Sequence, residues 1–438
     1  MSGPDDHVLS PPPTAPGALP LIGHALSLVR RPLAFLDAQR PLGDLVEFRV
    51  GRRPAYLVNH PDLVLEVLTG PGGRFDRGEI FSKARPLFGR GVAVADGVHH
   101  RDRRRAVQPL LSAARLPGYL DTLAGLVTAR THRWHAGTVV DLNAETAELT
   151  LDAVAATVFG KPLPAGFART VHDALPVVVA GLGRRAYGPA AALLDLLPSP
   201  ERARYRAALA QIHRVVDSLI EADPDSPTLR RLAAGADARQ LHDDVTSLLI
   251  GGSHTSGAAA AWILILLSRH PDVRERVEEE TGRVVGDRPV TAADLPALRF
   301  THQVVRETLR LYPPIWLFPR RAVTACRLGG HHVPRDAQVF YSPYSLHRDP
   351  RWFPAPDSFD PDRWGPGRPQ PPRGAYLPFA AGVHGCPGGD FAVGELALLT
   401  AAVTSRRRLD VTPGGRPLPL PAATLGPAPV TMTVIARP

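Results

Sequence analysis

The pattern of apolar and polar residues is helical over most of the chain. Apolar side chains recur every three to four residues, which is the spacing of one face of an α-helix. The helices predicted in this way cover residues 61–68, 100–112, 117–134, 145–159, 201–223, 241–269, 273–285 and 300–311. The segment 241–269 is the longest, is apolar through much of its length and ends at His270-Pro271.

Strand patterns are short and few. Residues 45–59 have the pattern of a small β-hairpin, and residues 320–344 place Gly-Gly and Val-Pro turn residues among alternating apolar positions. No internal repeat is evident and no long linker divides the chain. We therefore predict a mostly α fold with small β-sheets (α+β). A proline-rich N-terminal segment (residues 1–20) precedes a single domain (residues 21–438).

The charge is basic, but its distribution does not suggest nucleic-acid binding. The 438 residues include 51 basic and 42 acidic side chains, a formal charge of +9, and Lys83 and Lys161 are the only lysines. The arginines are scattered, and no basic run is interleaved with aromatic residues. A basic surface that steers an acidic protein partner agrees better with this distribution. Coding bias would give the same arginine excess.

The N-terminus lacks the apolar run of a signal peptide or a membrane anchor. Residues 1–10 are polar and residues 11–20 are rich in proline. The chain has two cysteines, too few for a disulfide framework or a cysteine-rich zinc site. We expect a cytoplasmic protein with both thiols reduced and no membrane anchor.

One of the two cysteines, Cys386, lies in a glycine-rich decamer. Residues 379–388 are Phe-Ala-Ala-Gly-Val-His-Gly-Cys-Pro-Gly, and an apolar helical stretch follows. Glycines allow positive φ and close approach of the backbone to a flat ligand. A sulfur at a helix N-terminus is favoured as a thiolate, which suits an axial ligand to haem iron. The alternative is a buried structural cysteine beside a turn.

The decamer resembles the haem-binding signature of the cytochrome P-450 superfamily at every specified position. The resemblance implies haem b (iron protoporphyrin IX) held by the thiolate of Cys386. The haem would lie between the long helix and the helix after Cys386. Phe379 and Gly388 match cofactor-binding positions, and His384 matches the position that reaches a haem propionate.

A second match concerns an ion network. Glu307 and Arg310, at i and i+3 on one predicted helix, resemble the Glu-x-x-Arg motif of the same family. Residues 359–364, Phe-Asp-Pro-Asp-Arg-Trp, are similar to the loop that supplies a further arginine, here Arg363. The resemblance implies a buried network that serves fold and haem retention. If the resemblance is set aside, a glutamate and an arginine at i and i+3 are typical of a solvated helix face.

Arginine and histidine residues are candidates for the haem propionates, since arginine forks match carboxylates. His100 and Arg104 resemble the His/Trp-x-x-x-Arg helix of the family, and Arg320 matches its strand arginine, although Arg321 is adjacent. The alternative for residues 100–105 is a solvated basic face. Its exposed arginines would then guide a redox partner.

The long helix carries the candidate residues for oxygen activation. Residues 249–257, Leu-Ile-Gly-Gly-Ser-His-Thr-Ser-Gly, interrupt an apolar pattern with glycines and hydroxyls, which predicts a local bulge. The stretch resembles the Ala/Gly-Gly-x-Asp/Glu-Thr segment of the family, with Thr255 at the threonine position. His254 replaces the usual carboxylate. Histidine relays protons near neutral pH, whereas the alternative is a histidine hydrogen-bonded within the core.

A pair of aspartates in the same helix has only part of a metal motif. Asp243-Asp244-Val-Thr-Ser247 is similar to the aspartate-rich magnesium site of terpene cyclases, but its fifth residue is not a carboxylate. Paired acids at the start of a helix are explained more simply as partners of the helix dipole.

The resemblance implies a haem-thiolate monooxygenase that inserts one oxygen atom from O2 into an apolar small molecule by hydroxylation or epoxidation. It also implies a separate ferredoxin and ferredoxin reductase, or a flavodoxin-type carrier, as electron donors. Residues 338–344 look similar to actinobacterial enzymes that oxidise terpenes, and this resemblance favours terpenoid secondary metabolism over a fatty-acid or macrolide hydroxylase. Rival hypotheses are a non-catalytic haem-binding partner protein and a haem isomerase or peroxygenase. The pocket lining that the resemblance implies is nearly all apolar, which suits a hydrocarbon-like ligand: Phe81, Leu87, Phe88, Val177, Val178, Val179, Ile250, Ile315 and Trp316.

Overall fold

The computed structural model describes residues 11–51, 53–70, 73–187 and 199–436. These residues form two compact units. The β-rich unit comprises residues 1–81, 316–356 and 371–385, and the α-rich unit comprises residues 82–315, 357–370 and 386–438. A mostly α fold with small sheets is confirmed. The single domain over residues 21–438 stays a prediction, and residues 1–10 of the N-terminal segment lie outside the described residues.

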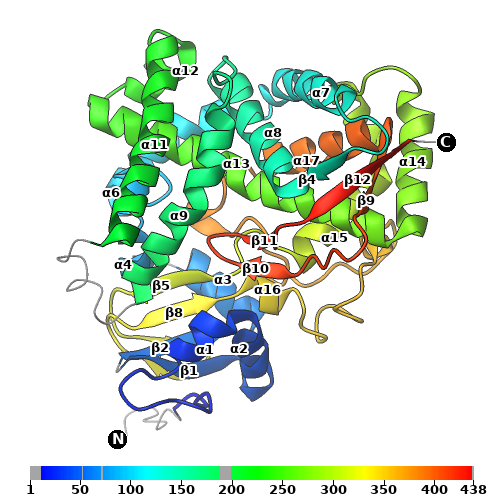
Figure 1. Cartoon of the computed structure of the whole chain (residues 1–438). Helices are drawn as coiled ribbons and strands as arrows, with labels where there is room; N and C mark the ends of the chain where they lie inside the picture. Colours follow the sequence, from blue (N-terminus) through cyan, green and yellow to red (C-terminus); the bar gives the residue numbers. More distant parts are fainter. Residues whose placement is uncertain (1–10, 52, 71–72, 188–198, 437–438) are drawn as a thin grey trace, which may run out of the picture. The chain divides into compact units, whose positions relative to one another are not determined.

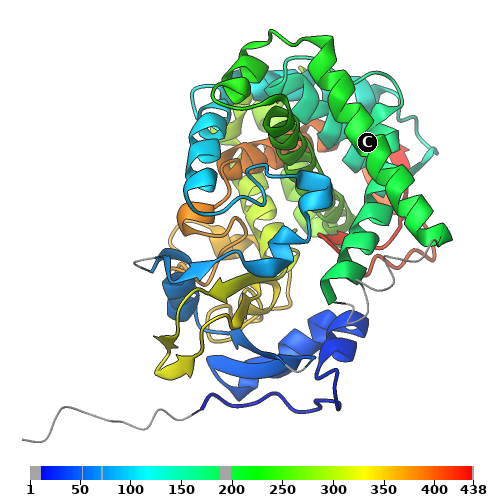
Figure 2. The same ribbon diagram turned by 90° about the vertical axis from the view of Figure 1, so that its left-hand side faces the viewer.

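The β-rich unit is built on a five-stranded sheet of order β1-β2-β8-β5-β3 (Figure 1). Its strands are β1 (Leu45–Val50), β2 (Arg53–Val58), β3 (Phe75–Asp76), β5 (Phe318–Ala322) and β8 (Gln338–Tyr341). The predicted hairpin over residues 45–59 is confirmed as the antiparallel pair β1–β2. Only β2 and β8 pair in parallel among these strands, and Figure 2 shows the blue β1–β2 hairpin beside the yellow strands.

Alternation along the strands gives this sheet two buried faces. Successive side chains of a strand point to opposite faces. Leu45 and Val58 belong to one apolar cluster with Val339, whereas Val46 and Leu57 belong to another that contains Phe35 of a covering helix. The remaining elements of the unit are α1 (Ala25–Arg30), α2 (Pro32–Gln39), η1 (Arg40–Leu42), α3 (Pro61–Thr69), β6 (Cys326–Leu328), β7 (His331–Val333), α16 (Pro343–Leu346) and η6 (Gly382–His384), with α4 (Gly78–Ser82) at the boundary.

Long helices dominate the α-rich unit. The helices of this unit are α5 (Arg85–Phe88), α6 (Gly97–Val107), α7 (Leu116–His132), α8 (Leu142–Val158), α9 (Phe167–Tyr187), α11 (Pro200–Ala222), α12 (Pro227–Ala233), α13 (Ala238–Arg269), α14 (Pro271–Val285), α15 (Arg299–Leu311) and α17 (Gly389–Thr404), with η3 (Gln108–Leu111), η4 (Ala292–Ala297) and η5 (Pro361–Trp364). The unit also contains an antiparallel sheet of order β4-β12-β9 and a β10–β11 hairpin. Their bounds are β4 (Val139–Asp141), β9 (Arg407–Val411), β10 (Pro419–Pro421), β11 (Leu425–Pro427) and β12 (Thr431–Ala436). All eight predicted helices are confirmed, with shifts of a few residues at their ends.

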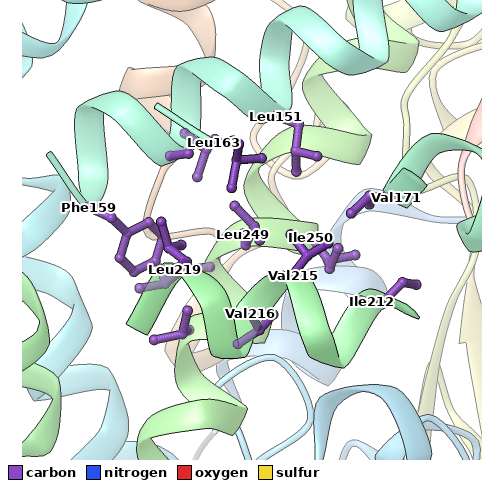
Figure 3. Close-up of a cluster of buried hydrophobic side chains, with 14 of the residues drawn as sticks. Leu151, Phe159, Leu163, Val171, Ile212, Val215, Val216, Leu219, Leu249 and Ile250 are labelled. Carbon is purple, nitrogen blue, oxygen red and sulfur yellow. The ribbon is translucent and has the colours of Figure 1, made fainter. Parts of the chain in front are cut away.

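The central element of the α-rich unit is α13, which contacts α8, α11, α15 and α17. Asp237 caps its start by accepting a hydrogen bond from the N–H of Gln240. By length and composition α13 could cross a membrane, but 78% of its most apolar window is buried in the protein, as in the core helix of a globular domain. Its side chains Leu249 and Ile250 meet those of α8 and α11 in the hydrophobic core (Figure 3).

The predicted bulge in residues 249–257 is wrong, because α13 is a continuous α-helix there. The hydroxyls of Ser253 and Thr255 donate to the carbonyl oxygens of Leu249 and Gly251, at 2.6 and 2.9 Å. These bonds join each hydroxyl to the residue four positions earlier, so they follow the turns of the helix.

Candidate functional site

Cys386 lies just before the first turn of α17, whose N-cap is Gly388. Its side chain is accessible, although the protein atoms around it remove enough water to raise the pKa of the thiol. The N–H of Gly388 and the positive charge of Arg104 act in the opposite direction and are the weaker influences. Burial therefore has a larger influence on the pKa of this thiol than the helix N-terminus. A bound cation would stabilise the thiolate.

The first turns of α6 bring His100 and Arg104 to the same helix face. His100 is buried, and the Arg104 guanidinium is close enough to Cys386 for the two groups to influence each other's pKa. Burial lowers the pKa of Arg104. The neighbouring Arg101 and Arg105 point to solvent. The helix thus has one face with the buried His100 and the half-buried Arg104, which are the two predicted propionate ligands, and an exposed basic face.

The middle of α13 has an uncovered strip in an otherwise buried helix. Gly251 is exposed and Thr255, one turn later, is half-buried, whereas Ser253, Ser256 and the turns on either side are buried. Thr255 donates its hydroxyl hydrogen to Gly251 at 2.9 Å. A threonine on the open strip of a core helix is accessible to a flat ligand placed against that strip.

The predicted ion network around Glu307 is confirmed, and it is larger than the sequence indicated. Arg310 donates two hydrogen bonds to Glu307, at 2.9 and 2.8 Å, and both side chains are fully buried. The Nε of Arg363 lies 3.5 Å from the Glu307 carboxylate. Trp364 Nε1 and the backbone N–H of Asp360 also donate to Glu307, at 2.9 and 3.0 Å. Trp364 was visible in the sequence motif, but nothing in the sequence assigned it this bond.

In the β-rich unit, His384 follows a glycine that the backbone requires. Gly382 has φ +70°, and a Cβ there would lie 2.2 Å from the carbonyl oxygen of Leu68. Of the three glycines expected to take positive φ in the decamer, only Gly382 does. The side chain of Arg77 donates to His384 Nδ1 at 3.2 Å. Phe379, the first residue of the decamer, is partly buried.

In the same unit, the two adjacent arginines of β5 have different surroundings. Arg320 is buried, donates to the carbonyl oxygen of Pro319 at 2.8 Å and lies 5.9 Å from the ring centre of Tyr341. Arg321 is half-buried and is paired with Asp76 of β3, with Nε to carboxylate at 3.2 Å. Since Arg321 already has an acid partner, Arg320 is the better candidate for a ligand carboxylate.

Comparison with known proteins decides the family. The family model described as "Cytochrome P450" matches residues 11–434. The chain is 38% identical to cyclooctatin synthase of Streptomyces melanosporofaciens over 95% of this chain and 94% of the relative. The chain belongs to the cytochrome P450 family.

Two further relatives and two solved structures agree with this cytochrome P450 assignment. Cyclooctat-9-en-7-ol 5-monooxygenase of Streptomyces melanosporofaciens is 37% identical over 92% of this chain and 90% of the relative. Pentalenene oxygenase of Streptomyces avermitilis is 34% identical over 94% of each chain. The haem domain of a cytochrome P450DA mutant superposes with a TM-score of 0.85 at 22% identity, covering 98% of each chain. A six-coordinated cytochrome P450 from Thermus thermophilus gives a TM-score of 0.74 at 25% identity, covering 92% of this chain and 98% of the other.

As a cytochrome P450, the chain is a haem b monooxygenase and an oxidoreductase. The residues of the α-rich unit fit that cofactor, because an accessible cysteine, a basic helix face and the open strip of α13 offer a metal ligand, carboxylate partners and a surface for a flat ring. Among the described residues no group of three or more histidine, cysteine, aspartate or glutamate side chains could hold a metal ion.

His254 departs from the family pattern in structure as well as in sequence. Its Nε2 lies 3.1 Å from the hydroxyl of Thr424, which follows β10. Burial, and to a smaller extent His172, lowers the pKa of His254 to about 4. The imidazole is therefore neutral at physiological pH. This geometry favours the alternative of a hydrogen-bonded core histidine, and the proton relay through His254 stays a prediction.

The aspartates with the incomplete magnesium motif serve the fold of the α-rich unit. Asp243 accepts from the N–H of Arg90 at 2.7 Å, and Asp244 accepts from Val92 N–H at 3.1 Å and from Arg103 Nε at 2.7 Å. They anchor the segment after α5 to α13. Sequence analysis also missed Glu395, a single acid in the apolar run of α17, whose side chain is fully buried.

Proposed function

We propose that this cytochrome P450 hydroxylates or epoxidises a terpenoid in secondary metabolism. The observation that carries the proposal is the set of Streptomyces relatives at 34 to 38% identity over more than nine-tenths of the chain. The names of two of them denote oxygen insertion into an unsaturated alcohol and into an alkene. Fatty acids and macrolides are the alternative substrates.

In this proposal, the Cys386 sulfur binds the haem iron, with Phe379 and Gly388 beside the cofactor. His100, Arg104, Arg320 and His384 bind the propionates. The bound haem supplies the activation of O2. The hydroxyl of Thr255, on the open strip of α13, transfers a proton at this site. The burial of Arg320 supports its role, because a buried guanidinium without a carboxylate partner costs free energy.

Some residues of the predicted pocket lining are buried in the hydrophobic core, and others are partly buried against it. Leu87, Val178 and Ile250 are buried in the hydrophobic core of the α-rich unit, and Phe88 and Val179 pack against it. The apolar character of these residues supports a hydrocarbon-like substrate. Thr424, held by His254, would fix the β10–β11 hairpin near this apolar region.

We propose a cytoplasmic enzyme that receives its electrons from a ferredoxin and a ferredoxin reductase, or from a flavodoxin-type carrier. The exposed arginines of α6, Arg101 and Arg105, support docking of an acidic carrier. The side chain of Arg105 is 79% accessible and lies 3.3 Å from Asp102. Such contacts are screened by salt, so carrier binding should weaken as ionic strength rises.

The test begins with the absorption spectrum of the reduced, carbon-monoxide-bound protein. Thiolate ligation by Cys386 gives a Soret band at the long-wavelength position for which the family is named, and Cys386→Ser should lose it. A wild-type protein without that band would overturn the ligand assignment.

Substrate-induced spectral shifts across a panel of terpenes, fatty acids and macrolides then test the substrate class. Shifts with fatty acids or macrolides alone would overturn the terpenoid proposal. Turnover with peroxide but not with reduced carrier would support a peroxygenase.

A further inference from the structure

The middle of α13 presents a second polar side chain, His254, beside Thr255. Residues 251, 254, 255 and 258 keep accessible surface, whereas residues 253, 256 and 257 are buried. The spacing i, i+3, i+4 and i+7 places His254 on the same helix face as Thr255. The protein around His254 nevertheless removes enough water to lower the pKa of its imidazole to about 4. His254 is thus enclosed by protein and still within reach of a small molecule on this face.

His254 shares one hydrogen bond with Thr424, which connects β10 to β11. The Nε2 atom lies 3.1 Å from the threonine hydroxyl, and Thr424 is buried. A neutral imidazole has one N–H donor and one acceptor nitrogen, and a hydroxyl has one donor and two acceptor sites. Whichever group donates in their common bond, the pair keeps one further donor and at least one further acceptor. Among the described residues, neither side chain forms another hydrogen bond.

The β10–β11 hairpin has other attachments at the next residue, Leu425. Its N–H donates to the carbonyl oxygen of Pro314 at 2.8 Å, and its carbonyl oxygen accepts from Trp262 Nε1 at 2.9 Å. Trp262 is itself fully buried in α13. These bonds should keep the hairpin in place when the bond between His254 and Thr424 is removed. A binding role of the pair can therefore be separated from a structural one.

The surroundings of the pair are apolar and uncharged. Ile250, one turn earlier on α13, belongs to the hydrophobic core, and Ala258, one turn later, lies 3.9 Å from the position of a Cβ on Gly426 of β11. Apart from burial, only His172 of α9 affects the pKa of His254 within the described residues, so no arginine, lysine or acid acts on it. Burial disfavours the imidazolium. The pair therefore suits a neutral ligand group rather than a carboxylate.

We propose that His254 and Thr424 form a polar subsite that binds a hydroxyl group of the substrate. An aliphatic hydroxyl both donates and accepts, which matches the donor and the acceptor that the pair keeps. In an otherwise apolar lining, a few polar groups fix the orientation of a ligand. The substrate class is thereby narrowed from a terpene hydrocarbon to a terpenoid alcohol. This assignment rests on the proposed oxidation of a terpenoid.

A subsite of this kind selects against a ligand that lacks the hydroxyl. A hydrocarbon placed against His254 and Thr424 would remove water from both groups without replacing its hydrogen bonds, and unpaired buried polar groups cost binding free energy. Removing the polar atoms of the pair should therefore weaken the binding of an alcohol and leave the binding of a hydrocarbon unchanged or stronger.

The test measures dissociation constants from the spectral shifts that ligands induce in the ferric holoprotein. The probes are pairs with a common carbon skeleton: geraniol with myrcene, farnesol with β-farnesene, and phytol with phytene. Thr424→Val and His254→Phe should each lower the ratio of alcohol affinity to hydrocarbon affinity about tenfold, the value of one hydrogen bond. Comparing this ratio between variant and wild type cancels the difference in hydrophobicity within a pair.

Two further variants control for a structural effect. Thr424→Ser keeps the hydroxyl and should keep the wild-type ratio. Ser253→Ala removes a buried hydroxyl that is bonded to the carbonyl oxygen of Leu249 at 2.6 Å, directly before His254, and should also keep that ratio. If the bond between His254 and Thr424 is only structural, its loss weakens both compounds of a pair equally, and this result would overturn the subsite.

The outcomes separate a failure of the subsite from a failure of the proposed function. Terpenes that bind with a ratio unchanged in Thr424→Val and His254→Phe, or hydrocarbons that bind while their alcohols do not, would refute the subsite and leave the terpenoid proposal intact. If none of these compounds binds, the terpenoid substrate is itself wrong, and the subsite with it. An alcohol that binds while its hydrocarbon does not, and that loses affinity in both variants, supports the subsite. Should Thr424→Val not fold, His254→Phe and Thr424→Ser carry the test.

Discussion

Single residues of the Cys386 decamer differ in what the backbone demands of them. Gly382 combines positive φ with a carbonyl oxygen at 2.2 Å from the position of a Cβ, whereas Gly385 has ordinary backbone angles and its nearest neighbour to a Cβ is at 3.2 Å. A side chain at Gly382 would strain the backbone and displace Leu68 of α3. Of these two glycines, Gly382 is therefore the one that the fold requires.

We accordingly predict different costs for two alanine substitutions in this loop. Gly382→Ala should lower the free energy of unfolding by about 2 kcal/mol or more, in the range typical of strain at a special backbone conformation. Gly385→Ala should cost less than about 1 kcal/mol. Urea denaturation of the two variants checks this. Equal losses would show that the loop can move away from Leu68.

At the scale of elements, the Glu307 network joins α15 to η5 and the loop before it. Glu307 receives hydrogen bonds from Arg310, Trp364 and the N–H of Asp360, and Arg310 also donates to the carbonyl oxygen of Ser358 at 3.0 Å. The bonds from Arg310 and Trp364 to Glu307 are buried, and the other two are partly buried. Removing the acid would leave the guanidinium of Arg310 buried without its partner.

Glu307→Gln should therefore lower the free energy of unfolding by about 3–5 kcal/mol, as is typical when one partner of a buried ion pair is removed. The control is Asp362→Asn, which breaks the pair with Arg276, whose side chains are each 46% accessible. Loss of that exposed pair should lower the free energy of unfolding by less than about 1 kcal/mol. Urea titrations of both variants measure the difference, and similar losses would contradict the buried-network account.

The elements that sequence could predict are those specified by local pattern. Periodicity located α13 and the Glu307 helix, and the decamer located Cys386. The helix α9 was missed because Pro176 lies inside it, and proline usually ends a helix. The partner of His254 could not be predicted, because Thr424 is 170 residues away. Glu395 was missed for the same reason, since its burial depends on helices distant in sequence.

At the scale of the whole molecule, His254 and Glu395 have opposite effects on the pH dependence of stability. The pKa of His254 is lowered from 6.5 to about 4 in the folded protein, so its contribution is complete above pH 6.5 and is lost as the pH falls toward 4. The pKa of Glu395 is raised from 4.5 to about 8. Its folded state favours the proton, so stability is lost as the pH rises from 4.5 to 8.

Between pH 4.5 and 6.5 the two slopes oppose each other, each by at most about 1.4 kcal/mol per pH unit. Their removal should therefore have opposite consequences. In Glu395→Gln, the free energy of unfolding should rise more steeply than in the wild type from pH 4.5 to 6.5 and decline less from pH 6.5 to 8. In His254→Gln it should fall more steeply than in the wild type between pH 4.5 and 6.5. The other titrating groups are common to all three proteins, so urea denaturation of each at pH 5, 6.5 and 8 isolates these slopes. Parallel profiles would mean that neither side chain keeps its shifted pKa in solution.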